Sequence, residues 1–124
     1  MKISVIMSVY NGERFLREAV GSILGQTFSE FEFIIVNDGS TDGSLAMLRT
    51  YADKDPRIVL IDQANTGLAQ ALNNGLAAAR AELVARMDAD DIALPDRLAK
   101  QYAFMQEHPE IGVSGGQIEL ISDA

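Results

Sequence analysis

Short apolar runs alternate with segments of helical period, and this alternation constrains the fold more than any other feature of the sequence. The apolar runs are rich in β-branched and aromatic residues and are bounded by Asn, Asp and Gly, which is typical of buried strands. Four such strands are expected at residues 3–9, 32–36, 57–61 and 83–87. A fifth strand is expected at either 111–113 or 117–121.

Between these runs, apolar residues recur every three or four positions, which indicates helices with one buried face. The expected helices cover residues 15–24, 45–51, 68–79 and 98–105. Strands that alternate with crossover helices predict an α/β fold: a Rossmann-like, mostly parallel sheet with helices on both faces. Because no repeat, linker or low-complexity tract divides the sequence, residues 1–124 are expected to form one domain.

The charge balance restricts the partners of the chain. It has 18 acidic and 10 basic residues, a formal net charge of −8, and twelve of the acidic residues follow residue 50. We expect no binding to nucleic acid, because phosphate backbones require a basic face. The acidic surplus indicates instead a cation, or a ligand that brings one. The absence of cysteine excludes disulfides, thiolate nucleophiles and zinc–thiolate sites.

The sequence shows no recognisable targeting or transmembrane segment. The apolar stretch 3–9 is too short for the core of a signal peptide. No run approaches the roughly 20 apolar residues that cross a bilayer. We therefore expect a cytoplasmic location, with peripheral attachment to the inner face of the membrane as an alternative.

Polar side chains follow each of the first four expected strands. In an open parallel sheet the carboxyl ends of the strands meet at one edge, where ligands bind. The sequence therefore predicts that carboxylates, amides and hydroxyls gather at this edge. They are Ser8, Tyr10 and Asn11 after the first strand, residues 37–40 after the second, Asp62 and Asn65 after the third, and residues 88–91 after the fourth.

Asp88, Asp90 and Asp91 form the densest group of carboxylates. Three carboxylates within four residues repel one another, so they either retain protons or hold a cation. Oxygen ligands with no neighbouring His or Cys suit Mg²⁺ or Mn²⁺. Arg86 shares the parity of Asp88 and Asp90, so an extended segment would project all of them to one side. The alternative is a solvated turn in which Asp91 caps the following helix.

The segment 38–42, DGSTD, admits two interpretations. Asp-Gly favours a turn, with Ser40 or Thr41 as the cap of the next helix. Alternatively, the carboxylate of Asp38 meets an N–H or hydroxyl group of a ligand at the strand end. Neither G-x-G-x-x-G nor G-x-x-x-x-G-K-[ST] occurs, which disfavours a dinucleotide-binding fold and excludes a P-loop.

Polar residues before and within the third expected helix are also ambiguous. Asn65 or Thr66 is a suitable cap for this helix. Residues 73–75, Asn-Asn-Gly, lower its helix propensity, by up to about 1 kcal/mol for the glycine. Their presence indicates a close approach to a neighbouring element or a contact with a ligand.

Three ordered segments are similar to the N-terminal half of a family 2 glycosyltransferase of the GT-A fold. This resemblance implies a metal-dependent, inverting transfer of a sugar from a nucleotide diphosphate sugar, with a UDP-sugar as the expected donor. The acceptor it implies is a glycan or a lipid-linked molecule. The segments are SVIMSVYNGERFLREAVGSILGQTFSEFEFIIVNDGSTDGS, NTGLAQALNNGL and VARMDADDIALPDRL.

The resemblance also implies roles for individual residues. Asp90, with Asp88, is expected to bind Mn²⁺ or Mg²⁺, and Asp38 to contact the base. The sequence departs from many relatives in having Leu72 where an Arg or Lys is common. We hypothesise that Arg86 partly replaces this cation. The expected donor-binding residues are Ser8, Tyr10, Asn11, Asp38, Asn65, Asn73, Arg86, Asp88 and Asp90.

Family members usually continue for a hundred residues or more and include an acidic residue that deprotonates the acceptor. The resemblance therefore implies that this chain is a donor-binding half, truncated at its C-terminus, with the general base beyond Ala124. We expect the 124-residue chain to bind nucleotide weakly and to transfer no sugar.

Other classes of protein remain open. A non-catalytic nucleotide-binding or interaction module is the main alternative. A phosphotransferase of the haloacid-dehalogenase type also uses D-x-D, with the first Asp as nucleophile, which would be Asp88. Against it, Ile92 stands where Thr or Val is usual, and the motif follows the fourth expected strand rather than the first.

Overall fold

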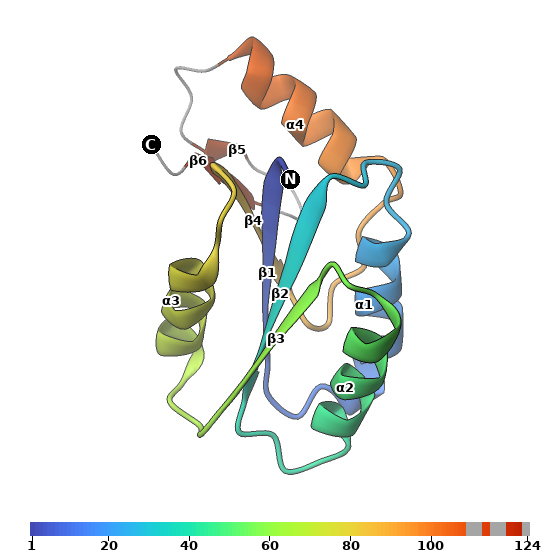
Figure 1. Cartoon of the computed structure of the whole chain (residues 1–124), viewed down its shortest axis with the longest axis vertical. Coiled ribbons are helices and arrows are strands. Elements are labelled where there is room, and N and C mark those ends of the chain that lie inside the picture. Colours follow the sequence, from blue (N-terminus) through green and yellow to red (C-terminus); the bar gives the residue numbers. More distant parts are fainter. Residues whose placement is uncertain (109–112, 115–118, 123–124) are drawn as a thin grey trace.

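The computed structural model describes residues 1–108, 113–114 and 119–122. Strands and helices alternate as the hydrophobic pattern predicts, which confirms the α/β class (Figure 1). The elements are β1 (Ile3–Val9), α1 (Glu13–Leu24), β2 (Phe31–Asp38), α2 (Ser44–Lys54), β3 (Ile58–Gln63), α3 (Leu68–Ala78), β4 (Leu83–Asp88), α4 (Arg97–Glu107), β5 (Val113–Ser114) and β6 (Glu119–Ser122).

The described strands form a single sheet in the order β3-β2-β1-β4-β6-β5. β1 pairs with β2 and β4 in parallel, and β2 pairs with β3 in parallel. β6 pairs with β4 antiparallel, and β5 pairs with β6 antiparallel. The expectation of one further strand in either of two segments is therefore wrong, because a strand lies in each. Residues 111–112 and 117–118 of those segments lie outside the described part of the chain.

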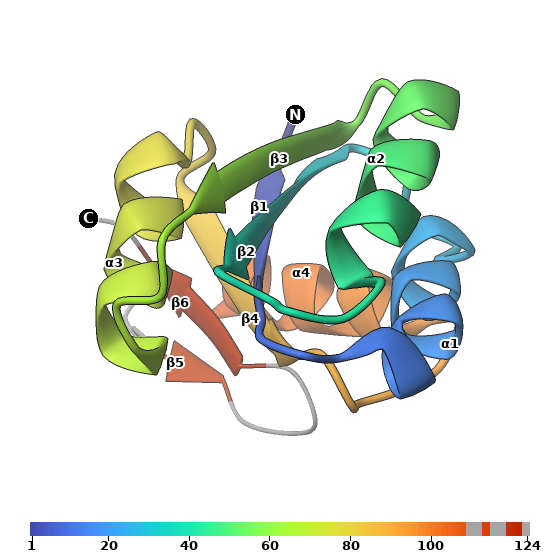
Figure 2. The same cartoon turned by 90° about the horizontal axis from the view of Figure 1, so that it is seen from below.

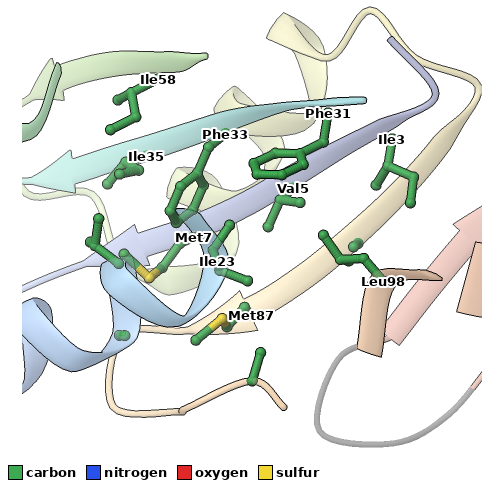
Figure 3. Close-up of a cluster of buried hydrophobic side chains, with 14 of the residues drawn as sticks. Ile3, Val5, Met7, Ile23, Phe31, Phe33, Ile35, Ile58, Met87 and Leu98 are labelled. Atoms are coloured by element: carbon green, nitrogen blue, oxygen red, sulfur yellow. The ribbon is translucent and has the colours of Figure 1, made fainter. Parts of the chain in front are cut away.

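Helices cover both faces of the sheet, as the sequence predicts. α3 lies on one face, whereas α1 and α2 lie on the other (Figure 2). Alternate side chains of β1 divide the core accordingly. Met7 belongs to the larger cluster with Ile23 of α1 and Leu98 of α4 (Figure 3), and Ile6 belongs to the smaller cluster with Ala71 of α3. Both faces are buried, which explains why the strands are nearly continuous apolar runs.

The strands continue past their apolar runs into polar residues. β2 extends to Asp38 and β3 to Gln63, two residues beyond the expected ends. The parallel register pairs Asn37 with Asp62 and Asp38 with Gln63. The Asn37 amide donates to Asp62 Oδ1 at 3.0 Å. Side-chain hydrogen bonds between neighbouring strands thus keep the ladder intact at the edge where ligands bind.

The glycine within α3 is explained by a close approach to the sheet. A Cβ at Gly75 would lie 2.7 Å from Ile6 Cγ2 and 3.2 Å from Val36 Cγ2. Both neighbours are buried branched side chains with little room to move. Of the two explanations that the sequence left open for residues 73–75, close packing therefore accounts for Gly75.

Candidate functional site

A hollow of about 310 Å³ opens at the carboxyl ends of β1 and β4. The register places Ser8 of β1 beside Asp88 of β4, so the two strands end side by side. The structure thus brings together five of the residues that the sequence singled out. The hollow is lined by Ser8, Tyr10, Asn11, Gly12, Phe15, Leu68, Asp88, Ala89 and Asp90.

The carboxylates of Asp88, Asp90 and Asp91 converge beside this hollow. One oxygen from each lies within 4.8 Å of those of the other two. The parity argument requires an extended segment, which holds for Arg86 and Asp88 but not for Asp90, because β4 ends at Asp88 and the chain then turns. The Asp91 N–H donates to the Asp88 carbonyl at 3.1 Å within this turn.

The electrostatics of the cluster favour a cation. Burial raises the pKa of Asp91, and the negative charges of Asp88 and Asp90 raise it further. Three hard oxygen donors at this spacing fit Mg²⁺ or Mn²⁺. The alternative role of Asp91 as a helix cap is not supported, because α4 begins at Arg97 and its cap residue is Asp96.

Arg86 and Asn73 lie on the α3 face of the sheet, outside the lining of the first hollow. They line a second, mainly apolar hollow of about 260 Å³ between α3 and β4, together with Leu72. Arg86 Nη2 lies 3.8 Å from Asp88 Oδ1, so this cation connects the second hollow to the carboxylate cluster. The guanidinium is therefore close enough to the cluster to share an anionic ligand with a bound cation.

Asp38 is buried, with 2% of its surface exposed, and its carboxylate accepts hydrogen bonds from its own chain. Oδ1 accepts from Gln63 Nε2 at 3.0 Å and from Thr66 N at 2.9 Å, and Oδ2 accepts from Gly67 N at 3.0 Å. Burial alone would raise the pKa of Asp38, but these bonds outweigh it and lower the pKa. Asn65 Nδ2 donates to the Asp38 carbonyl at 3.0 Å, so these two predicted residues do lie together.

The residue that caps α3 is not one of the two that the sequence predicted. Gly67 is the cap residue. The N–H groups of Thr66 and Gly67, just before the helix, donate to the Asp38 carboxylate rather than to a side chain of Asn65 or Thr66. The chain can turn toward this loop directly after β2 because Gly39 has a φ of +71°. A Cβ at Gly39 would lie 2.5 Å from the Asn65 backbone nitrogen, so only glycine lets the two loops meet.

The loops after β1 and β2 are joined by hydrogen bonds that sequence reasoning missed. Ser40 and Thr41 do not cap α2; instead Asp42 Oδ1 accepts from Ser44 N at 2.9 Å. Ser40 Oγ accepts from Asn11 N at 3.0 Å, and Asn11 Oδ1 accepts from Thr41 N at 2.8 Å. Asp42 stands one position before Gly43, the cap residue of α2, and an Asp this close to the start of a helix is a signal that could have identified it.

Comparison with known proteins identifies the family. The model of glycosyl transferase family 2 matches residues 4–122. The chain belongs to this family. It is 44% identical over 116 residues to the putative glycosyltransferase EpsE of Bacillus subtilis, covering 92% of this chain and 42% of EpsE. It is 39% identical over 118 residues to the amylovoran biosynthesis glycosyltransferase AmsE of Erwinia amylovora, covering 93% of this chain and 44% of AmsE.

Solved structures confirm the GT-A fold of this family 2 chain. TarS of S. aureus, solved in complex with UDP-GlcNAc, is 34% identical with a TM-score of 0.82, covering 88% of this chain and 32% of TarS. The mannosyltransferase PcManGT of Pyrobaculum calidifontis, solved with GDP-Man and Mn²⁺, has a TM-score of 0.88 at 23% identity, covering 98% of this chain and 44% of that one. The chain thus spans less than half the length of EpsE and of AmsE. Among the described residues, no helix is long and apolar enough to cross a membrane.

Proposed function

We propose that this family 2 chain is the donor-binding part of an inverting, metal-dependent glycosyltransferase that uses a UDP-sugar. The observation that carries the proposal is the convergence of Asp88, Asp90 and Asp91 beside the hollow at the ends of β1 and β4. The donor diphosphate would lie next to this cluster. The choice of UDP is supported by TarS, which is 34% identical and has been solved with UDP and with UDP-GlcNAc.

Different residues of the first hollow would contact different parts of the donor. Tyr10 is 55% exposed and offers a flat ring at the rim, on which a base could stack. Ser8 and Asp88, paired in register, offer a hydroxyl and a carboxylate to the ribose. Asp90, with Asp88, would hold Mn²⁺ or Mg²⁺. When bound, such a cation stabilises the negative charge that develops on a departing nucleoside diphosphate.

The second hollow would receive the part of the donor that extends past the cluster. Asn73 and Arg86 line it, and Arg86 stands 3.8 Å from Asp88. Inversion would follow from attack by an acceptor hydroxyl on the face of the sugar opposite the diphosphate. We propose that the acceptor is a glycan or a lipid-linked molecule. We place the general base beyond Ala124, because the relatives are more than twice as long as this chain.

Binding of UDP tests this proposal directly. We expect calorimetry to show UDP binding in the presence of Mn²⁺, and about a tenfold weaker affinity with Asp90→Asn, since this change removes a charged ligand. Asp53→Asn is the matched control, because Asp53 is an exposed carboxylate on α2, away from the site. UDP affinity that neither Mn²⁺ nor Asp90→Asn alters would contradict a metal-dependent donor site. No UDP binding at all would favour the interaction module.

Arg86 gives a second prediction, which concerns the diphosphate alone. Arg86→Ala is expected to weaken UDP binding about fivefold, because a half-exposed guanidinium contributes on the order of 1 kcal/mol to an anion. Uridine lacks the diphosphate, so its affinity should not change. Arg17→Ala, which removes an exposed arginine of α1, controls for the loss of one positive charge. Equal UDP affinity in Arg86→Ala and the wild type would show that Arg86 does not replace the missing cation.

A further inference from the structure

Asn11 joins two loops that lie about thirty residues apart in the sequence. It has a φ of +52°, a left-handed conformation that asparagine tolerates better than most residues. Its Oδ1 accepts from Thr41 N at 2.8 Å and from Thr41 Oγ1 at 3.3 Å. Its own N–H donates to Ser40 Oγ at 3.0 Å. We call this set of residues, Asn11, Ser40 and Thr41, the loop clamp.

The same two loops also cap the helices that follow them. Gly12 N donates to Ser44 Oγ at 3.0 Å, and Glu13 N donates to Asp42 Oδ2 at 3.3 Å. In the opposite direction, Gly43 N donates to Glu13 Oε2 at 3.2 Å. N–H groups at the start of α1 are thus satisfied by Asp42 and by Ser44, the first residue of α2, and the N–H before α2 is satisfied by Glu13, the first residue of α1. Figure 2 shows the two connections running side by side toward the first turns of these helices.

We propose that Asn11 is a positioning residue for the donor site and that it acts through the loop clamp. Asn11 lines the first hollow, but its oxygen is already engaged twice by Thr41. Its neighbours in the chain, Tyr10 and Gly12, also line the hollow, and their backbone is held by the clamp. The clamp therefore fixes the rim on which the base would stack. This inference rests on the proposed function and specifies what one of its residues does.

A double-mutant cycle tests the loop clamp without introducing charge. Asn11→Gly keeps the left-handed backbone available and removes the side-chain acceptor, whereas the pair Ser40→Ala and Thr41→Val removes the two side-chain partners, Ser40 Oγ and Thr41 Oγ1, and keeps the Thr41 backbone N–H. Ser40 and Thr41 do not line the first hollow. We expect Asn11→Gly to weaken UDP binding with Mn²⁺ about tenfold and the partner pair about threefold, since hydrogen bonds contribute on the order of 1 kcal/mol each. The combination should lose less affinity than the two separate losses add up to, because both changes remove the hydrogen bond from Thr41 Oγ1 to Asn11 Oδ1.

Direct contact between Asn11 and the nucleotide gives a different result. The partner pair would then bind UDP like the wild type, and this outcome would overturn the proposal. Asn11→Asp separates the two roles further, because it keeps the Oδ1 acceptor and loses only the amide donor. Asn11→Asp also adds a negative charge, so it is measured with uridine, which carries none, and it should lose much less affinity than Asn11→Gly. A loss as large as that in Asn11→Gly would make Asn11 a direct ligand.

Amide exchange distinguishes failure of the clamp from failure of the proposed function. We expect the N–H groups of Thr41 and Gly43 to exchange about tenfold faster in Asn11→Gly than in the wild type, because Thr41 loses its acceptor. If the wild type binds no UDP, the proposed function fails, and unchanged exchange would then overturn the clamp as well. If the wild type binds UDP and all these variants bind it equally well, the donor site stands and the positioning role of Asn11 is wrong.

Discussion

Glu32→Ala is expected to lower the free energy of unfolding by about 3 kcal/mol, because it leaves the buried Ser4 hydroxyl and the half-buried Arg80 N–H without their acceptor. Glu32 is the second residue of β2 and has only 2% of its surface exposed. Its Oε2 accepts from Ser4 Oγ at 2.6 Å and from Arg80 N at 2.7 Å, and its Oε1 accepts from Arg80 Nε at 3.1 Å. Ser4 Oγ in turn accepts from Ala81 N at 3.1 Å.

These bonds attach the start of β4 to the two central strands. Ser4 and Glu32 are partners in the register of β1 and β2, and Arg80 and Ala81 form the connection from α3 to β4. Arg80→Ala is the matched control. The Arg80 side chain is 68% exposed, so its loss removes one charged partner and leaves the two shorter bonds in place. We expect this control to cost about 1 kcal/mol, as surface ion pairs do.

The effect of Glu32 should depend on pH in a defined direction. Burial alone would raise the pKa of Glu32, but the hydrogen bonds from Ser4 and Arg80, with the charge of Arg80, lower it below its ordinary value of 4.5. The stability that the ionised carboxylate contributes is therefore complete above pH 4.5 and is lost as the pH falls through the lower pKa of the folded state. In urea denaturation, the difference between the wild type and Glu32→Gln should narrow below this pH. At pH 7, a loss of unfolding free energy in Glu32→Ala that is no larger than the loss in Arg80→Ala would contradict the prediction.

The sequence predicted the elements of this fold well and their ends less well. The apolar runs located β1 to β4 and the apolar stripes located α1 to α4, because burial on both faces of a parallel sheet leaves a strong local pattern. The ends of β2 and β3 were placed two residues short, since Asp38 and Gln63 are polar and are held in the ladder by neighbours on another strand. Such pairing depends on register, which hydrophobic pattern does not specify at polar positions.

For the candidate site, the sequence predicted which residues lie together better than it predicted what each of them does. The sequence predicted that Ser8, Tyr10 and the aspartates lie together, because the carboxyl ends of adjacent parallel strands lie at one edge of a sheet. It could not separate residues that line a hollow from residues that support one. Asn11 and Asp38 lie at or just after the end of a strand, as Asp88 does, but their partners come from loops about thirty residues away. Local spacing predicted Ser40 and Asn65 as helix caps, whereas the neighbouring Asp42 and the distant Asp38 accept from the N–H groups instead.

Asp38→Ala is expected to destabilise the chain about as much as Glu32→Ala, by about 3 kcal/mol, because the backbone N–H groups of Thr66 and Gly67 lose a charged acceptor. The change should also loosen residues 65–68. Leu68 lines the first hollow, so the effect would reach the donor site even if Asp38 never touches the base. Hydrogen exchange at Thr66 and Gly67, which we expect to accelerate strongly, measures the first effect, and uridine affinity measures the second.

Asp38→Asn separates support of the loop from contact with the base. Its Oδ1 can still accept from Thr66, while its amide group faces the Gly67 N–H and cannot accept from it, so we expect an intermediate loss of stability. Because these hydrogen bonds outweigh burial and lower the pKa of Asp38, the stability that it contributes should be lost only as the pH falls below 3.8. If Asp38 acts only through the loop, uridine affinity should fall in proportion to the exchange rates in the two variants. Abolished uridine binding in Asp38→Asn, with exchange at Thr66 unchanged, would show instead that the carboxylate contacts the base directly.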